Sequence, residues 1–324
     1  MNPDKEILTH PWLHPIYRFA WNSRARVESS RRGITRLEVV VMLVLCFITA
    51  GVGMILLARH RESAQRVQCE ERLRRIGQAF YGYHSASSAE EASQHLPPSR
   101  IADGYATWAV LLAPYLIDQH PLTQWDVQQS YFAQKAEVRD SLMLFYFCPA
   151  RPRSDRLSQA GDVDAANKHF PGGLGDYACV AGDGSEDHDW TGPNANGPLV
   201  IAEVLERKGD RILKWQSRTS LAQLERHRGK SYTLLVGEKH VPLDHEGDAA
   251  FGDGSFYNGQ HPASFSRVAG PGFPIAPSPN APFNKNFGSA HNGICNFLLA
   301  DSSRRALAIN TSEHVLGEMA RRGD

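Results

Sequence analysis

The chain has 324 residues, of which 42% are hydrophobic and 22% charged, and its 35 basic residues balance its 35 acidic ones. This length allows one to three domains. A net charge of zero argues against a nucleic-acid partner, because nucleic acids normally bind a basic surface.

The first segment, residues 1–33, is basic and rich in aromatic side chains but shows neither a helical nor a strand period. We assign it no regular structure. Its charge favours a cytoplasmic amino terminus. The arginines from Arg59 onward make the far side of the next segment basic as well. Charge alone therefore does not determine the orientation.

An uncharged apolar run, 39–58, follows the leader, and only Thr49, Gly51 and Gly53 interrupt its large side chains. As a helix it would be about 30 Å long, the thickness of the hydrocarbon core of a bilayer. It lacks the polar face of a long soluble helix. The run also exceeds a secretory signal core and has no small-x-small cleavage site. We predict a membrane span; a buried core helix is the alternative.

Beyond residue 58 the same helix is predicted to continue, to a total of about 50 residues, with one apolar face. Such a stripe requires a globular body to cover it. Gly77 and Gly82 each lower the stability of a helix by about 1 kcal/mol relative to alanine. They are expected to allow close packing against the helix. The residues of the stripe, at steps of four, three, four and three, are Cys69, Leu73, Ile76, Phe80 and Tyr83.

The body begins after a connection, 85–98, and is predicted to be α+β, with an antiparallel sheet packed on the long helix. Ser220 and Gln223 stand at capping-box spacing. Long loops are expected at 182–198 and 242–293. The predicted strands are 108–112, 142–148, 176–181, 198–204, 211–215, 232–238, 294–300 and 304–309, and the predicted helices are 126–140, 220–227 and 312–322. The domains are then a leader, 1–33, a transmembrane and amphipathic helix, 34–84, and a body, 85–324.

The junction between leader and span reads Gly33-Ile34-Thr35-Arg36-Leu37-Glu38. It resembles the processing site of type IV prepilins and type II secretion pseudopilins. The resemblance implies that prepilin peptidase cuts between Gly33 and Ile34, that Ile34 is methylated, and that Glu38 contacts a neighbouring subunit's amino terminus. It places the leader in the cytoplasm and the body outside the inner membrane. A carboxylate at a bilayer edge is costly unless paired, which also indicates a function for Glu38.

Five further motifs follow one another through the chain. They are Cys69-x-x-x-Leu73-x-x-Ile76-Gly77-x-Ala79, Phe147-Cys148-Pro149, Asp176-Tyr177-Ala178, 231–238 ending in Gly237-Glu238, and 287–301 containing His291. In this order they resemble the motifs of the DUF1559 family of planctomycete prepilin-like proteins. The resemblance implies a pilin-like fold and a membrane location, but no activity. Ser302-Ser303 departs from the family's Gly-Ser and removes a residue suited to a primed hairpin turn.

The cysteines of the body form an even set, Cys69, Cys148, Cys179 and Cys295, whereas Cys46 lies in the span. Disulfides persist outside the cytoplasm. Of the three possible pairings we favour Cys69–Cys148, which would join helix to sheet, and Cys179–Cys295, which would join two strands. Buried free thiols are the alternative. We expect no zinc site, because no Cys-x-x-Cys pair is present.

An acidic loop offers Asp183, Asp187 and Asp189 as oxygen ligands of the kind that Ca²⁺ prefers. Some pseudopilins bind calcium near their carboxyl end, so the resemblance also points to Ca²⁺. The spacing is not that of an EF-hand, and a solvated loop is the alternative. A second polar cluster, 240–248, lacks the His-Glu-x-x-His pattern of a metal site.

Catalytic motifs are absent from the sequence: 229–231 lacks the first glycine of a P-loop, and no Gly-x-Ser-x-Gly elbow occurs. His291 and Glu238 are interpreted as structural. The leading hypothesis is a non-enzymatic prepilin-like membrane protein that assembles through its helix into a pseudopilus or a related secretion filament. Its partners would be membrane lipid, prepilin peptidase and other pilin-like subunits. A monomeric membrane-tethered module that binds an extracytoplasmic ligand is the alternative.

Overall fold

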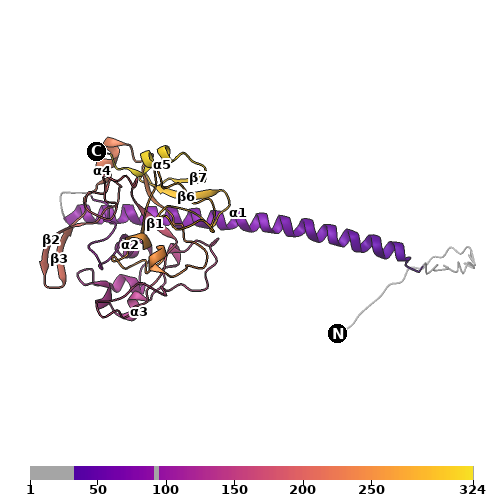
Figure 1. The fold of residues 1–324 in the computed structure, drawn as a ribbon, viewed down its shortest axis with the longest axis horizontal. Coiled ribbons are helices and arrows are strands. Elements are labelled where there is room, and N and C mark those ends of the chain that lie inside the picture. The colour runs from indigo at the N-terminus through magenta and orange to yellow at the C-terminus, as the bar shows by residue number, and fades with distance from the viewer. Residues whose placement is uncertain (1–32, 91–94, 324) are drawn as a thin grey trace, which may run out of the picture. The chain divides into compact units, whose positions relative to one another are not determined.

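The computed structural model describes residues 33–90 and 95–323 (Figure 1). Residues 1–32, the predicted leader up to the glycine of the processing motif, lie outside the described residues. The chain forms two compact units, Met1–Ile55 and Leu56–Asp324.

The long helix α1 (Arg36–Glu90) has 55 residues, close to the length of about 50 that its apolar pattern predicted. In the first unit its apolar side chains are exposed, including Phe47 at 77% and Met54 at 67%. The hydroxyl of Thr49 donates to the Leu45 carbonyl at 2.9 Å, which satisfies it without water. The helix is long and apolar enough to cross a membrane, and none of its most apolar stretch is buried. This apolar stretch is therefore not a buried core segment.

In the second unit α1 carries the predicted apolar stripe into the core. Cys69, Leu73 and Ile76 are fully buried. A Cβ added to Gly77 would lie 2.9 Å from Leu298 Cδ1, and one added to Gly82 would lie 2.9 Å from the Tyr115 ring. Both glycines thus allow the close approach that we expected. The helix continues past residue 85, where a connection was predicted.

The second unit contains a five-stranded sheet in the order β5-β1-β4-β6-β7. Figure 1 labels three of its strands, β1, β6 and β7. Neighbouring strands are antiparallel except for β1 and β5, which are parallel, so the sheet is mixed and not wholly antiparallel. A separate hairpin joins β2 to β3. The fold class is α+β, as predicted. The strands are β1 (Tyr177–Gly182), β2 (Glu203–Lys208), β3 (Arg211–Gln216), β4 (Leu234–Glu238), β5 (Ser266–Val268), β6 (Ile294–Leu299) and β7 (Arg304–Ala308).

Both faces of the central strands β1, β4 and β6 are covered, because side chains alternate along a strand and nearly all residues of these three strands are buried. On β1, Cys179 packs in the same cluster as α1 and the helix α2 (Trp108–Leu116). Its neighbour Val180 packs in a second cluster, together with Cys295 of β6 and the helix α5 (Glu313–Ala320). The two clusters form the core of the second unit.

Several predicted elements are wrong. The run 108–112, predicted as a strand, belongs to helix α2. Residues Trp108 to Ala113 of this helix are all buried, so the sequence shows no alternation of polar and apolar faces by which a helix could be recognised. The predicted helix 126–140 is reduced to α3 (Ala136–Arg139) and a 3₁₀ turn. The predicted strand 142–148 is a turn as well, and the one at 198–204 begins only at residue 203.

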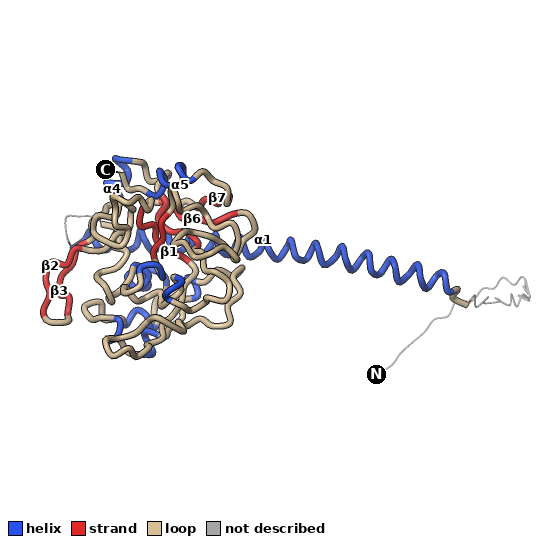
Figure 2. Tube along the Cα trace, in the orientation of Figure 1, coloured by secondary structure: helices blue, strands red, loops and turns tan. Residues whose placement is uncertain are grey.

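Other local predictions hold. Helix α4 (Leu221–His227) begins where expected, and Ser220 Oγ accepts from the Gln223 N–H at 3.2 Å. Strand β5 was not predicted, because it has three residues and lies within the long loop 242–293. Figure 2 shows how much of the second unit consists of loops. The 3₁₀ turns are η1 (Pro121–Gln124), η2 (Tyr131–Ala133), η3 (Leu144–Tyr146), η4 (Ala249–Phe251) and η5 (Pro262–Ser264).

Candidate metal centre

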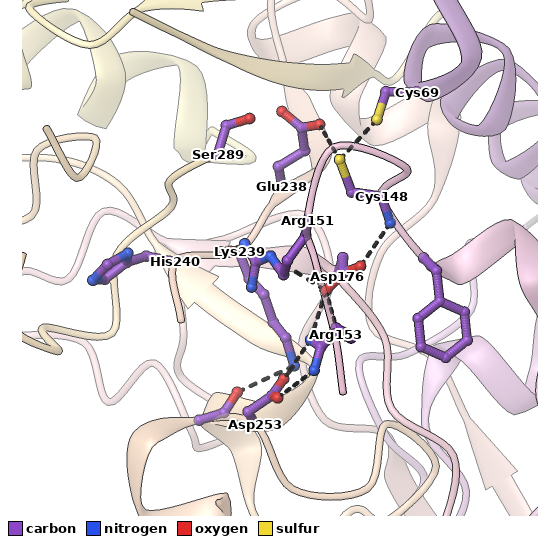
Figure 3. A network of polar contacts seen from close by, with 12 residues as sticks. Cys69, Cys148, Arg151, Arg153, Asp176, Glu238, Lys239, His240, Asp253 and Ser289 are labelled. Carbon is purple, nitrogen blue, oxygen red and sulfur yellow. Dashed lines mark hydrogen bonds and ion pairs between the residues drawn. The ribbon is translucent and has the colours of Figure 1, made fainter. Parts of the chain in front are cut away.

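Four buried side chains from four parts of the second unit come together in what we call the Cys–His–Glu cluster. Figure 3 shows three of them, Cys69, Cys148 and Glu238. Cys69 lies on α1, Cys148 follows η3, Glu238 ends β4, and His291 precedes β6. The two sulfurs, one imidazole nitrogen and one carboxylate oxygen all lie within 4.8 Å of one another. Each of these atoms is a ligand that metal ions use in proteins.

Cys148 lies at the centre of the cluster. Its Sγ is 2.9 Å from Cys69 Sγ, 3.6 Å from Glu238 Oε1 and 3.7 Å from His291 Nε2. The imidazole and the carboxylate are also in contact, with His291 Nε2 3.4 Å from Glu238 Oε1. The arrangement therefore has a thiol pair on one side and an imidazole–carboxylate pair on the other.

Backbone and amide hydrogen bonds hold these side chains in place. The N–H of Cys148 donates to Asp176 Oδ2 at 2.6 Å. The second oxygen of Glu238 accepts from the backbone and the side-chain amide of Asn296, at 2.8 and 3.1 Å. The N–H of His291 donates to Ser289 Oγ at 2.9 Å. The cluster is thus supported by three separate segments.

A network of buried ion pairs lies next to the cluster (Figure 3). Arg153 donates to Asp176 at 2.6 Å and to Asp253 at 2.7 Å, and Lys239 Nζ is 2.9 Å from Asp253. These side chains are at most 3% exposed. Buried charges remain stable only when they are paired and hydrogen-bonded. Because Asp176 also binds the backbone of Cys148, the network and the cluster share one carboxylate.

The cluster shifts the proton affinities of its members in opposite directions. The hydrogen bond from Cys69 lowers the pKa of Cys148 to about 7 against the effect of burial, and the same contact raises the pKa of Cys69. Burial acts to lower the pKa of His291, but its contacts with Cys148 and Glu238 raise it to about 10. Burial acts to raise the pKa of Glu238, yet His291 and Asn296 hold it below its ordinary value. The cluster thus favours a thiolate and a carboxylate beside a positive charge.

The structure corrects one of the two predicted disulfides. All five cysteines are free thiols. Cys179 and Cys295 pack on opposite faces of the sheet, where Cys179 Sγ is 3.1 Å from Ser266 Oγ and Cys295 donates to the Glu238 carbonyl. That pairing is wrong. Cys69 and Cys148 are adjacent, as predicted, but are not bonded.

The residues considered for calcium do not gather into a site. Asp183 is buried, and its oxygens are occupied by Ser185, Asn196 and Arg321. Asp189 caps the turn at Thr191, and Asp187 is exposed. In the described part of the chain, no group of three or more possible metal ligands includes these aspartates.

At the predicted processing site, Gly33 and Ile34 are exposed and precede the first turn of α1. The Thr35 N–H donates to Glu38 Oε2 at 2.8 Å, and the Glu38 N–H donates to Thr35 Oγ1 at 3.2 Å. This reciprocal pair is a capping box. Glu38 thus has a local partner, Thr35, that the sequence analysis missed, although the Thr-x-x-Glu spacing is typical of a capping box.

The expectation of no zinc site rested on local spacing. In the fold, Cys69 and Cys148 are 79 residues apart in sequence, and Cys148 and His291 are 143 apart. No spacing rule covers ligands this far apart. The signal that the sequence did carry is that all four residues fall within motifs of the family it resembles.

The comparison with known families agrees with those motifs. Residues 58–313 match the model of a family described as "Protein of unknown function (DUF1559)". The match includes all four residues of the Cys–His–Glu cluster. No curated protein and no solved structure matches the chain.

Proposed function

Because the chain belongs to the DUF1559 family, we propose that it is a prepilin-like, membrane-anchored protein without catalytic activity. Prepilin peptidase would cut it between Gly33 and Ile34. The first half of α1 would then anchor it in the inner membrane, with the body outside the cytoplasm. Copies of α1 would assemble into a pseudopilus or a related filament.

One observation carries this proposal: a single helix serves as both anchor and core. α1 continues without interruption from Arg36 to Glu90. In the first unit its apolar side chains are exposed, and in the second unit Cys69, Leu73 and Ile76 are fully buried. A helix with an exposed apolar half suits a lipid environment, and its buried half ties it to a folded domain.

The junction before α1 also supports cleavage. A peptidase needs its target peptide bond in an extended, accessible segment. Gly33 and Ile34 are exposed and non-helical, and a Cβ built on Gly33 meets no described residue other than its chain neighbours within 4 Å. The capping box of Thr35 and Glu38 starts the helix only after this bond.

Processing is tested by expressing the full chain together with a prepilin peptidase and extracting it from the membrane with detergent. We expect intact mass and amino-terminal sequencing to give a chain that begins at methylated Ile34. Gly33→Leu should block the cut. Gly53→Leu is the matched control, because a Cβ built there likewise meets none of the described residues beyond the neighbouring turns of its own helix within 4 Å. A wild-type chain that still begins at Met1 would contradict the proposed cleavage.

Assembly is tested with the native thiol of the span. Cys46 is exposed on α1. Oxidative crosslinking in membranes should give dimers that disappear in Cys46→Ser. A chain that stays monomeric in wild type, at high expression, would instead favour a tethered module that binds a ligand by itself.

A further inference from the structure

We propose that Cys69, Cys148, Glu238 and His291 bind one zinc ion, which fastens the buried half of α1 to the sheet. All four residues belong to the second unit, so the inference does not depend on processing or assembly. It gives the Cys–His–Glu cluster a structural role in a protein that we propose has no catalytic one.

The spacing of the ligand atoms suits a tetrahedral site. With Zn–S near 2.3 Å and Zn–N and Zn–O near 2.1 Å, neighbouring ligand atoms stand about 3.4 to 3.8 Å apart. The observed separations among Cys148, Glu238 and His291 are 3.4, 3.6 and 3.7 Å. Cys69 Sγ fits less closely: it is 2.9 Å from Cys148 Sγ, and all four ligand atoms lie within 4.8 Å of one another, so its side chain must move by about 1 Å to complete the tetrahedron.

The donor set selects the metal class. Two sulfurs, an imidazole and a carboxylate suit zinc, whereas Ca²⁺ and Mg²⁺ prefer oxygen ligands throughout. On binding, the two thiol protons and any proton on the imidazole leave to solvent, so that the ion is held by two thiolates, a neutral imidazole and a carboxylate. Four protein ligands close the site, as in structural zinc centres.

The surroundings supply the supporting contacts that a metal site requires. Asn296 holds the oxygen of Glu238 that does not face Cys148, and Asp176 holds the backbone of Cys148. The hydroxyl of Tyr177 is completely buried beside the sulfur of Cys69. A metal-bound thiolate would accept a hydrogen bond from it. Such outer contacts orient ligands and raise metal affinity.

A route from solvent reaches the cluster. His291 lines an open hollow of about 250 Å³ together with residues of α1 and the loop before β6. Glu62 and Ser63 lie in its wall. A hydrated cation can therefore approach the imidazole before it loses its water.

A disulfide between Cys69 and Cys148 is the competing outcome, since the two sulfurs are close. It would leave Glu238 and His291 as a buried pair with no role. A disulfide uses only the two sulfurs and leaves the convergence of the imidazole and the carboxylate on Cys148 unexplained. One metal ion uses all four donor atoms. The four-residue arrangement therefore favours the ion.

The experiment uses the full chain in detergent, reduced and then freed of metal with a chelator. Titration with Co²⁺ should give one equivalent per chain, with tetrahedral d–d bands and a thiolate-to-cobalt charge-transfer band that one equivalent of Zn²⁺ removes. Cys148→Ser should lose the charge-transfer band or shift it strongly. Cys179→Ser is the matched control, a buried thiol outside the cluster, and should keep the wild-type spectrum.

Two outcomes would overturn the proposal. One is a reduced wild-type chain that shows no cobalt spectrum up to millimolar Co²⁺. The other is protein, purified without chelator, that contains no zinc and has Cys69 and Cys148 linked in peptide mapping. Both measurements use wild-type protein, so they decide the matter even if Cys148→Ser does not fold.

Discussion

The backbone N–H of Cys148 donates a 2.6 Å hydrogen bond to Asp176 Oδ2, while Arg153 holds the other oxygen of that carboxylate at 2.6 and 2.9 Å. One buried aspartate therefore connects the Cys–His–Glu cluster to the ion network. A substitution in the ion network should therefore also affect the Cys–His–Glu cluster.

Arg153→Met should strongly destabilise the second unit. The substitution leaves Asp176 and Asp253 buried with fewer partners, and breaking a buried pair on one side typically costs about 3–5 kcal/mol. The free energy of unfolding of the full chain in detergent, measured with denaturant, should fall by about 3–5 kcal/mol.

The matched control for that variant is Arg211→Met. Arg211 pairs with Asp126 at 3.2 Å, but both side chains are more than a third exposed. An exposed pair contributes about 0–1 kcal/mol. Equal losses for the two variants would mean that the buried network does not support the fold in the way its burial indicates.

Asn296→Ala should weaken zinc binding without removing a ligand. The variant deletes the 3.1 Å amide contact to Glu238 but keeps the 2.8 Å contact from the backbone. Loss of such an outer contact typically lowers metal affinity about 10–100-fold. Competition with a coloured chelator measures the change. The exposed Asn194 lines neither the cluster nor the hollow and provides the control, so Asn194→Ala should bind zinc as wild type does.

Asp183 should contribute to acid unfolding. Burial acts to raise its pKa, but hydrogen bonds from Ser185, Asn196 and Arg321 lower it from 3.8 to about 2. The folded state therefore binds this proton more weakly than the unfolded state. The resulting stability is fully present above pH 4 and is lost as the pH falls towards 2. A pKa difference of about 2 between the folded and unfolded states corresponds to about 2–3 kcal/mol in the free energy of unfolding.

Denaturant unfolding of the full chain between pH 5 and pH 2 measures this contribution. Asp183→Asn should be less stable than wild type at pH 5, and its stability should fall less steeply as the pH decreases. Parallel slopes for the two proteins would show that Asp183 is not a source of the acid sensitivity.

The two interpretations of Glu38 can be separated at the start of α1. Glu38→Gln keeps a capping box, because glutamine serves at that position, but it removes the charge. Thr35→Ala removes the cap and keeps the charge. If the carboxylate contacts a neighbouring subunit, Cys46 crosslinking should fall in Glu38→Gln and persist in Thr35→Ala. The reverse pattern would assign Glu38 to capping alone.

Local patterns in the sequence determined much of the long helix and part of the sheet. The uncharged run 39–58 and the stripe from Cys69 to Tyr83 predicted one continuous helix, because helical period and length are properties of neighbouring residues. The close approach at Gly77 and Gly82 followed from the same reasoning. Strands β1, β4, β6 and β7 were also found near their observed positions.

Only the tertiary structure decided which face each cysteine takes and which ligands meet. Cys179 and Cys295 both lie on strands, but strand register and order place them on opposite faces. Helix α2 is buried all along its first part, so its sequence carries no amphipathic period. Cys69, Cys148, Glu238 and His291 meet because α1 packs on one face of the sheet and strand pairing brings β4 beside β6. These contacts join residues far apart in the chain, and no local spacing encodes them.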